Sequence, residues 1–299
     1  MKTVLMIIIL ALIVQYSFGQ QFTDLYGNYL GQTPPGDTPV VFAPGIISTQ
    51  SLEHSAAIFT PDGNEVYWYA FMMNEISAPH HIRFMKRINN RWTKPEAFLP
   101  FGDSIHYLDP FLSLDGKKLY FSAKVYKKHE IWFVEKNGDG WGTPKSADTA
   151  INNADYQGQP ALNSSGTLYY LSSSGIARSK FKNGQFQKPE ILSFNINLDK
   201  TDLDPCIAPD DSYLIFASMR RNCTRNLYIS FHDTISDRWS EPINFGEPIN
   251  GICTRFAAIS PDGKYLFFTR YNGEIMSQDI FWVSANIIDR LREKSRIKK

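Results

Sequence analysis

Short apolar segments separated by polar turns make up most of this chain, and the same arrangement of segments is repeated five times. Each copy has a run of small or apolar residues, a tight turn of the Pro-Asp-Gly kind, and a second run rich in Tyr, Phe, Leu and Ile. Alternating runs of this length beside such turns predict β-strands joined by hairpins. The five turns are centred on Asp62, Asp115, Ser165, Asp210 and Asp262, which lie 45 to 53 residues apart.

A period of about fifty residues built from strands predicts a β-propeller, because one copy is a small sheet that cannot bury its faces alone. We expect four strands per copy: a small-residue strand at the axis, an apolar strand after the turn, a third strand, and an outer strand introduced by proline. In the first copy the last three fall at 65–70, 81–86 and 91–96. Proline suits the outer strand because an edge has no ladder partner to lose. The sequence therefore predicts an all-β fold with four-stranded blades.

The fifth copy lacks an outer strand, and the N-terminal region carries one without a blade of its own. Residues 37–43 repeat the pattern of residues 93–99. We therefore expect residues 38–43 to complete the last blade, so that the N-terminal strand closes the ring. This predicts a five-bladed β-propeller over residues 38–285; six blades are the alternative.

The two ends of the chain are expected to lie outside the propeller. Residues 1–19 contain a lysine, an apolar run and a small final residue, which is typical of a cleaved signal peptide; residues 20–37 then form a lead-in. The apolar run is shorter than the roughly 20 residues that a membrane-spanning helix needs. Residues 286–299 are predicted to form a basic helical tail. We expect a secreted or periplasmic monomer with no membrane span.

Charge and cysteine content narrow the possible partners and cofactors. Lys and Arg total 31 and Asp and Glu total 30, so no basic field favours a nucleic acid. Cys206, Cys223 and Cys253 allow one disulfide and leave one thiol over. The sequence has no Cys-x-x-Cys pair, no phosphate-binding glycine loop and no Gly-x-Ser-x-Gly elbow. We therefore expect no bound cofactor and no serine peptidase.

The fifth copy resembles a known repeat. Residues 260–264 read Ser-Pro-Asp-Gly-Lys, residues 265–270 read Tyr-Leu-Phe-Phe-Thr-Arg, and residues 278–281 read Gln-Asp-Ile-Phe. This pattern resembles the WD-like repeat of the TolB-type β-propellers, which are secreted or periplasmic bacterial proteins. The resemblance implies the propeller fold over nearly the whole mature chain. It implies little about activity, because that family includes protein-binding modules, peptidase-associated propellers and polysaccharide lyases.

Polar residues just before each innermost strand are expected to surround one mouth of the central axis. Six residues before the turns, one column contains two carboxylates and a glutamine; eight residues before them, a second column is mostly polar. Equivalent positions of a radial repeat lie around one axis, so we expect a polar funnel that binds a protein or an extracellular glycan. The funnel residues are His54, Tyr107, Asp109, Gln157, Gln159, Asp202, Asp204 and Arg255.

The carboxylates of the funnel have two interpretations. As catalytic groups, Asp109, Asp204 and Glu53 would serve a glycoside hydrolase or polysaccharide lyase, with carboxyl groups roughly 5 to 9.5 Å apart across an open pocket. As structural groups, Asp109 and Asp204, each followed by proline, would accept hydrogen bonds from backbone N–H groups of their own turns and stay ionised. The repetition of the Asp-Pro pair favours the structural interpretation. We therefore expect ligand binding without hydrolase activity.

Histidines offer one candidate metal site. His54 and His106 both precede innermost strands and would need a glutamine as a further ligand. His80, His81 and His129 precede third strands, and we expect them on another face of the molecule. Scattered histidines are more often hydrogen-bonded surface residues than ligands, so we expect no bound metal.

Overall fold

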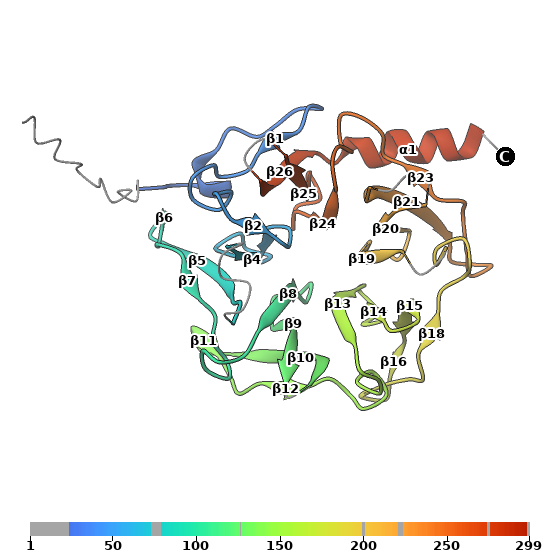
Figure 1. The fold of residues 1–299 in the computed structure, drawn as a ribbon, viewed down its shortest axis with the longest axis horizontal. Coiled ribbons are helices and arrows are strands. Elements are labelled where there is room, and N and C mark those ends of the chain that lie inside the picture. Colours follow the sequence, from blue (N-terminus) through green and yellow to red (C-terminus); the bar gives the residue numbers. More distant parts are fainter. Residues whose placement is uncertain are drawn as a thin grey trace, which may run out of the picture.

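The computed structural model describes residues 24–72, 79–125, 127–198, 201–220, 224–273 and 276–297. The predicted signal peptide, residues 1–19, and Cys223 lie outside these ranges. Within them, small antiparallel sheets stand around a central axis (Figure 1). No helix in the described ranges is long and apolar enough to cross a membrane. The prediction of an all-β propeller is confirmed.

The described strands pair into five four-stranded sets, here named blades 1 to 5. The innermost strands are β3 (Ile58–Phe59), β8 (Tyr107–Leu112), β13 (Gln157–Leu162), β19 (Leu203–Ile207) and β24 (Arg255–Ile259). The second strands are β4 (Glu65–Phe71), β9 (Lys118–Val125), β14 (Leu168–Ser172), β20 (Tyr213–Ser218) and β25 (Tyr265–Asn272). The third strands are β5 (Ile82–Ile88), β10 (Lys128–Asn137), β15 (Gly175–Ser179), β21 (Asn226–Asp233) and β26 (Ser277–Ser284). The outer strands are β7 (Glu96–Ala97), β12 (Lys145–Ser146), β18 (Glu190–Ile191), β23 (Ile243–Asn244) and, in blade 5, β1 (Val40–Val41).

Short additional strands extend the blades. Those that pair with the ends of third strands are β6 (Arg91–Trp92), β11 (Gly140–Trp141) and β22 (Arg238–Trp239). In blade 3, β16 (Phe181–Lys182) pairs with β17 (Gln185–Phe186). β2 (Leu52–Glu53) pairs with β4 of blade 1 and with β26 of blade 5. These two blades therefore share one continuous sheet.

Each repeated turn has one residue in the left-handed conformation, which is a glycine in four blades and Asp211 in blade 4, and in four blades an aspartate precedes it. Gly63 has a φ of 66°, a left-handed value that glycine adopts at low cost. The Asp62 carboxylate accepts hydrogen bonds from the Asn64 backbone N–H at 3.0 Å and from the Thr60 hydroxyl at 2.6 Å. The same backbone bond recurs in the turns of three other blades, at Asp115, Asp210 and Asp262. These aspartates hold the inner hairpins together.

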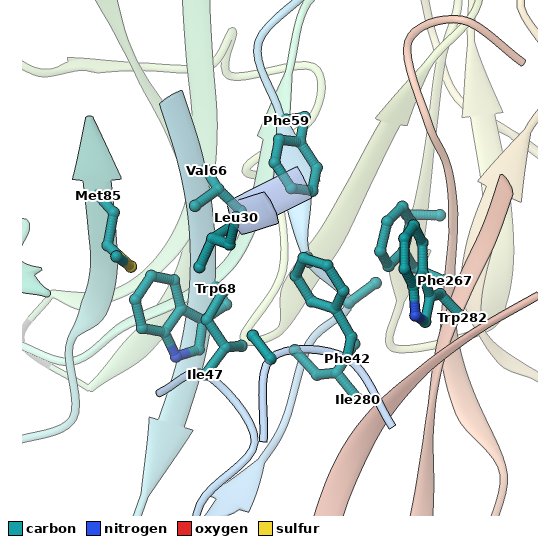
Figure 2. Packing of buried hydrophobic residues seen from close by; sticks show 14 of the residues in the cluster. Leu30, Phe42, Ile47, Phe59, Val66, Trp68, Met85, Phe267, Ile280 and Trp282 are labelled. Carbon is teal, nitrogen blue, oxygen red and sulfur yellow. The ribbon is translucent and has the colours of Figure 1, made fainter. Parts of the chain in front are cut away.

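β1 closes the ring by adding the outer strand of blade 5, as the sequence predicts. Val40 pairs with Trp282 and Val41 with Phe281 in antiparallel register. The next residue, Phe42, is fully buried, and its ring centroid lies 5.2 Å from that of Trp282. Figure 2 shows this ring among aromatic and aliphatic side chains of the cluster between blades 1 and 5. Burial of these rings holds the N-terminal segment on the last blade.

The lead-in and the tail both pack on the ring. In η1 (Asn28–Gly31), Tyr29 has a left-handed φ of 50°. Its ring centroid lies 5.2 Å from that of Phe59 in blade 1 and 5.2 Å from that of Tyr265 in blade 5. α1 (Asn286–Ile297) packs its apolar face on the cluster of blades 4 and 5. The lead-in thus covers the junction of blades 5 and 1, and α1 covers the junction of blades 4 and 5.

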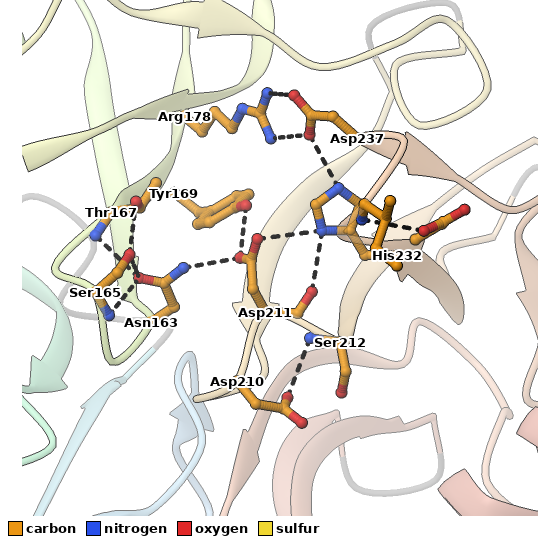
Figure 3. A network of polar contacts seen from close by, with 12 residues as sticks. Asn163, Ser165, Thr167, Tyr169, Arg178, Asp210, Asp211, Ser212, His232 and Asp237 are labelled. Atoms are coloured by element: carbon orange, nitrogen blue, oxygen red, sulfur yellow. Dashed lines mark hydrogen bonds and ion pairs between the residues drawn. The ribbon is translucent and has the colours of Figure 1, made fainter.

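A polar network joins blade 3 to blade 4 (Figure 3). Asp211, at the turn of blade 4, accepts hydrogen bonds from the Tyr169 hydroxyl at 2.7 Å and from the Asn163 amide at 2.9 Å. The His232 ring lies between two carboxylates, 3.1 Å from Asp211 and 3.0 Å from Asp237. Hydrogen bonds that cross from one blade to the next fix neighbouring blades relative to each other.

Candidate functional site

A bulge in four of the five innermost strands brings side chains to the axis. Asp109, Gln159, Asp204 and Phe256 have left-handed φ values between 50° and 57°, and the pairing register of each strand shifts at that point. Residues other than glycine rarely adopt this conformation. Its recurrence at one position in four blades makes the bulge a regular part of the repeat. All four residues line a single cavity between the innermost strands.

This cavity, here named the central channel, has a volume of about 320 Å³. Beyond the layer of bulged residues its wall is largely apolar and includes Phe111, Ile207 and Ile259. Turn residues such as Pro61 and Leu114 also line it, and Leu114 is 45 % exposed. The channel therefore extends from a polar layer to a rim formed by the inner hairpin turns.

Polar contacts cross from blade to blade at the bulges. Arg255 of blade 5 donates to both carboxylate oxygens of Asp204 in blade 4, at 2.8 and 3.0 Å. Gln159 of blade 3 also donates to Asp204 and accepts from its backbone N–H at 2.8 Å. The Asp204 side chain is 1 % exposed, so both of its oxygens are occupied and shielded from solvent. Asp109, Gln159, Asp204 and Arg255 are named the polar belt below.

Asp109 of blade 2 has one occupied carboxylate oxygen. Ser122 Oγ donates to Oδ2 at 2.7 Å, and the Gln159 backbone N–H donates to the same atom at 3.3 Å. Oδ1 has no hydrogen-bond partner among the residues that the structure describes. Burial raises the pKa of this carboxyl to about 6, and the charge of Asp204 adds to the rise. Asp109 therefore changes charge near neutral pH.

The expectation that the backbone of their own turns holds Asp109 and Asp204 is wrong. The one backbone donor that reaches Asp109 belongs to Gln159, in the next blade. The other donors are the side chains of Ser122, Gln159 and Arg255. The expectation of a carboxyl that stays ionised also fails for Asp109, since burial raises its pKa. The physical reason is that each Asp-Pro pair marks a bulge inside a strand rather than a turn before it.

The second column of the predicted funnel does not line the channel. Tyr107, Gln157 and Asp202 are at most 1 % exposed, and the channel wall does not include them. The Tyr107 hydroxyl bonds to the backbone of residues 101–102 at 2.8 Å, and Asp202 binds Arg220 at 2.8 Å. Tyr107 and Asp202 thus anchor neighbouring chain segments. The prediction placed this column at the axis because it assumed regular alternation, which a bulge interrupts.

Blade 1 has one residue more before its inner hairpin than the alignment of copies assumes. Glu53 pairs with Ala70 as Tyr107 pairs with the equivalent alanine of blade 2, so Glu53, not His54, occupies this position. Glu53 is fully buried, and Thr49 donates to its Oε1 at 3.0 and 3.2 Å. Burial raises its pKa to about 9. Glu53 therefore faces its own loop as a neutral carboxyl and is not part of the channel wall.

Histidine and aromatic rings lie close together near the N-terminal ends of the innermost strands of blades 1, 2 and 5. The His54 ring centroid lies 4.8 Å from that of Phe256, and burial lowers the pKa of His54 to about 3. The His80 backbone N–H donates to His106 Nδ1 at 3.3 Å. The expected placement of His80 and His106 on different faces is wrong, because the backbone of His80 bonds to that of Tyr107 at 2.8 Å. In the described ranges, no three potential ligands are placed to hold a metal ion.

Two parts of this site are not among the residues predicted from the sequence. Ser122 lies inside the apolar second strand of blade 2, and a lone hydroxyl there was a usable signal for a buried partner. The apolar wall residues Phe111, Ile207 and Ile259 follow bulged positions by two or three residues. No pattern in the sequence separates them from the apolar residues that pack between blades.

Comparison with known proteins finds similarity in structure only. No protein-family profile and no curated protein matches the chain. The chain is similar to TolB from Agrobacterium tumefaciens, with a TM-score of 0.51 and 16 % identity over 79 % of this chain and 78 % of that one. It is similar to the GH43 endo-arabinanase from Bacillus licheniformis, with a TM-score of 0.52 and 13 % identity over 79 % and 94 %. It is also similar to a bifunctional GH43-CE protein from Bacteroides eggerthii, with a TM-score of 0.52 and 13 % identity over 85 % and 34 %.

These similarities confirm the TolB-like propeller fold that the repeat implied. Identities of 13 to 16 % show the fold alone. One of the similar proteins is named as an endo-arabinanase and another as TolB, so the fold accommodates different functions. The function of this chain must be argued from its own channel.

Proposed function

We propose that the protein is a non-catalytic binding module, secreted or periplasmic after removal of residues 1–19, whose ligand occupies the central channel. The observation that carries this proposal is an apolar channel that ends at the polar belt. Ligand pockets commonly have volumes of about 300–1,000 Å³, mostly apolar walls and a few polar groups. The channel, at about 320 Å³, has each of these features.

The apolar wall favours a protein segment over a glycan as the ligand. A sugar carries hydroxyl groups on all sides, and each one that leaves water needs a hydrogen-bond partner. Beyond the polar belt the channel presents mainly aliphatic, aromatic and proline side chains. A peptide residue has one backbone N–H and one C=O to pair, and its apolar side chain suits this wall, so it leaves fewer polar groups unpaired than a sugar does. An extracellular glycan is the second candidate ligand.

A carbohydrate-active enzyme is the alternative function, with Asp109, Asp204 and Glu53 as its carboxylates. The raised pKa of Asp109, about 6, is the observation that favours it, since a general acid must hold its proton near neutral pH. Two observations oppose it. Arg255 and Gln159 occupy both oxygens of Asp204, and Glu53 bonds to Thr49 away from the channel wall. Asp109 therefore has no second carboxylate free to act as its partner.

A hydrolysis assay tests the choice between binding and catalysis. We expect the purified mature protein to release no reducing sugar from arabinan or other extracellular polysaccharides, because Asp204 is held by its neighbours. Release of sugar by the wild-type protein that disappears in Asp109→Asn would establish the enzymatic alternative. The Asp109→Asn variant is the matched control for contaminating hydrolase, which the substitution would leave active.

Substitution at the rim tests whether the ligand site is the channel. We expect Leu114→Arg to weaken binding of the neutral fluorescent dye N-phenyl-1-naphthylamine about fivefold to tenfold, because the half-buried leucine offers apolar contact at the rim. Ile235 is 97 % exposed and is not in the channel wall, so Ile235→Arg is the matched control and should leave dye binding unchanged. An equal loss in both variants would place the site outside the channel.

A further inference from the structure

The polar belt at the inner end of the channel carries an excess of negative charge. Asp109 and Asp204 are the charged residues among those that line the channel in the described part of the chain. Arg255 supplies the positive charge of the polar belt, and its guanidinium is bound to Asp204. When Asp109 is ionised, the belt therefore has one negative charge in excess. That charge lies on the residue whose Oδ1 has no partner among the described residues.

The rim at the other end of the channel is also acidic. In four blades the turn aspartate directly follows, in the sequence, a residue of the channel wall. These aspartates are Asp62, Asp115, Asp210 and Asp262. Hydrogen bonds from Ser113 and from the Lys117 backbone lower the pKa of Asp115, so this carboxyl is ionised at neutral pH. Among the described residues, the basic groups that interact with these aspartates are Lys117, Lys264 and Arg292. Four carboxylates against three basic groups leave the rim negative.

We propose that the ligand is an apolar peptide segment that enters the channel from the acidic rim and places an ammonium group on Asp109 Oδ1. The ammonium group is an N-terminal amine or a lysine side chain at the leading end of the segment. This inference rests on the proposed function and names the chemistry of its ligand.

The available oxygen selects an ammonium over a guanidinium. A guanidinium binds a carboxylate best through two parallel hydrogen bonds, one to each oxygen. Asp109 Oδ2 already accepts from Ser122 and from the Gln159 backbone, so only Oδ1 can accept from a ligand. An ammonium is a compact point charge that needs one such oxygen.

The apolar wall of the channel indicates an apolar stem for the ligand, and the negative rim indicates where the ligand enters. Phe111, Ile207 and Ile259 lie in the wall between the polar belt and the rim, so they would contact the part of the ligand that follows the ammonium. A negative rim attracts cations and repels anions before contact is made. The channel should therefore accept a cation on an apolar stem and reject an anion on the same stem.

Displacement of bound N-phenyl-1-naphthylamine by four probes with one octyl stem tests the inference. The probes are octylammonium, octylguanidinium, octanol and octanesulfonate, each titrated into the mature protein at pH 8. We expect octylammonium to displace the dye at a concentration about tenfold lower than octanol does, because a charge-assisted hydrogen bond is stronger than a neutral one. Octylguanidinium should fall between these two, and octanesulfonate should be the weakest.

Two variants assign the selectivity to Asp109. Asp109→Asn should bring octylammonium to the level of octanol while leaving octanol unchanged, because the amide keeps the shape of the channel and loses the charge. Asp139 is exposed in the turn between β10 and β11, so Asp139→Asn changes the net charge equally and should leave all four probes unchanged. Circular dichroism shows whether each variant is folded.

The outcomes separate this inference from the proposed function. Equal displacement by octylammonium and octanol in the wild-type protein would overturn the ammonium inference and leave the channel as a binding site. Selectivity that persists in Asp109→Asn would overturn the assignment to Asp109. Absence of binding by the dye and by all four probes, measured directly by calorimetry, would overturn both the inference and the proposed function.

Discussion

The charge of Asp109, and with it the net charge of the polar belt, depends on pH. The charged and titratable neighbours of Asp109 are Asp204 and Arg255 in the polar belt and the phenols of Tyr69 and Tyr156. Burial raises its pKa from 3.8 to about 6, so the native state holds the proton more tightly than the unfolded state does. The stability that this carboxyl contributes is therefore present below pH 3.8 and is lost as the pH rises through 6.

Because the Asp109 carboxylate destabilises the native state at pH 7, we predict that Asp109→Asn stabilises the protein at that pH. The variant should increase the free energy of unfolding at pH 7 by about 1–3 kcal/mol, since one pKa unit corresponds to about 1.4 kcal/mol. The amide oxygen can still accept from Ser122 and from the Gln159 backbone. Well below pH 3.8 the difference from wild type should disappear, because Asp109 is then protonated in both states. Urea denaturation at pH 7 and at a pH well below 3.8 measures both values.

Asp115 provides a control of opposite sign. Hydrogen bonds from Ser113 and from the Lys117 backbone lower its pKa, so its ionised form stabilises the native state at pH 7. Asp115→Asn should therefore lower the free energy of unfolding at pH 7. A loss of stability in both variants would contradict the assignment of a raised pKa to Asp109.

Among the elements, β1 has the largest expected effect on stability. Phe42 follows β1 and is fully buried among rings of blades 1 and 5, so Phe42→Ala should lower the free energy of unfolding by about 3–5 kcal/mol. Val40 lies in β1 but is 43 % exposed, and Val40→Ala should cost less than about 1 kcal/mol. Thermal and urea denaturation of the two variants measure the contrast. Equal, small losses would show that the N-terminal strand does not hold the ring closed.

The strand pattern could be predicted from the sequence because it depends on local signals. Tight turns recur in each copy, with a glycine such as Gly63 in four of the five, and so does the alternation of apolar residues. The missing outer strand of the fifth copy identified the role of residues 38–43. These features act over a few residues, so one sequence displays them. The fold and its closure follow from them.

The directions of the site side chains could not be predicted in the same way. A constant spacing from the turn does not reveal a left-handed residue inside a strand, so the spacing predicts turns at Asp109 and Asp204, where the structure has bulges. Such a bulge interrupts regular alternation, which is why Tyr107 and Asp202 do not line the channel. In blade 1, one additional residue moved Glu53 into the position assigned to His54. Each error comes from tertiary pairing that spacing alone does not encode.

At the scale of the whole molecule, the five blades enclose one channel with an apolar wall, a polar inner end and an acidic rim. Solved structures with a similar fold include a protein named TolB and an endo-arabinanase, so the architecture alone does not decide between binding and catalysis. The contacts of the carboxylates support our proposal of binding without catalysis. Asp204 is occupied by contacts that join the blades, which leaves Asp109 without the second free carboxyl group that glycoside hydrolysis uses.

A crystal structure of the mature protein with octylammonium tests the central claim, that the ligand site is the channel, most directly. We expect the octyl stem to lie along Phe111, Ile207 and Ile259, with the nitrogen within hydrogen-bond distance of Asp109 Oδ1. Octylammonium bound on the outer rim of the blades, or at the end of the innermost strands near His54 with the channel unfilled, would contradict the account.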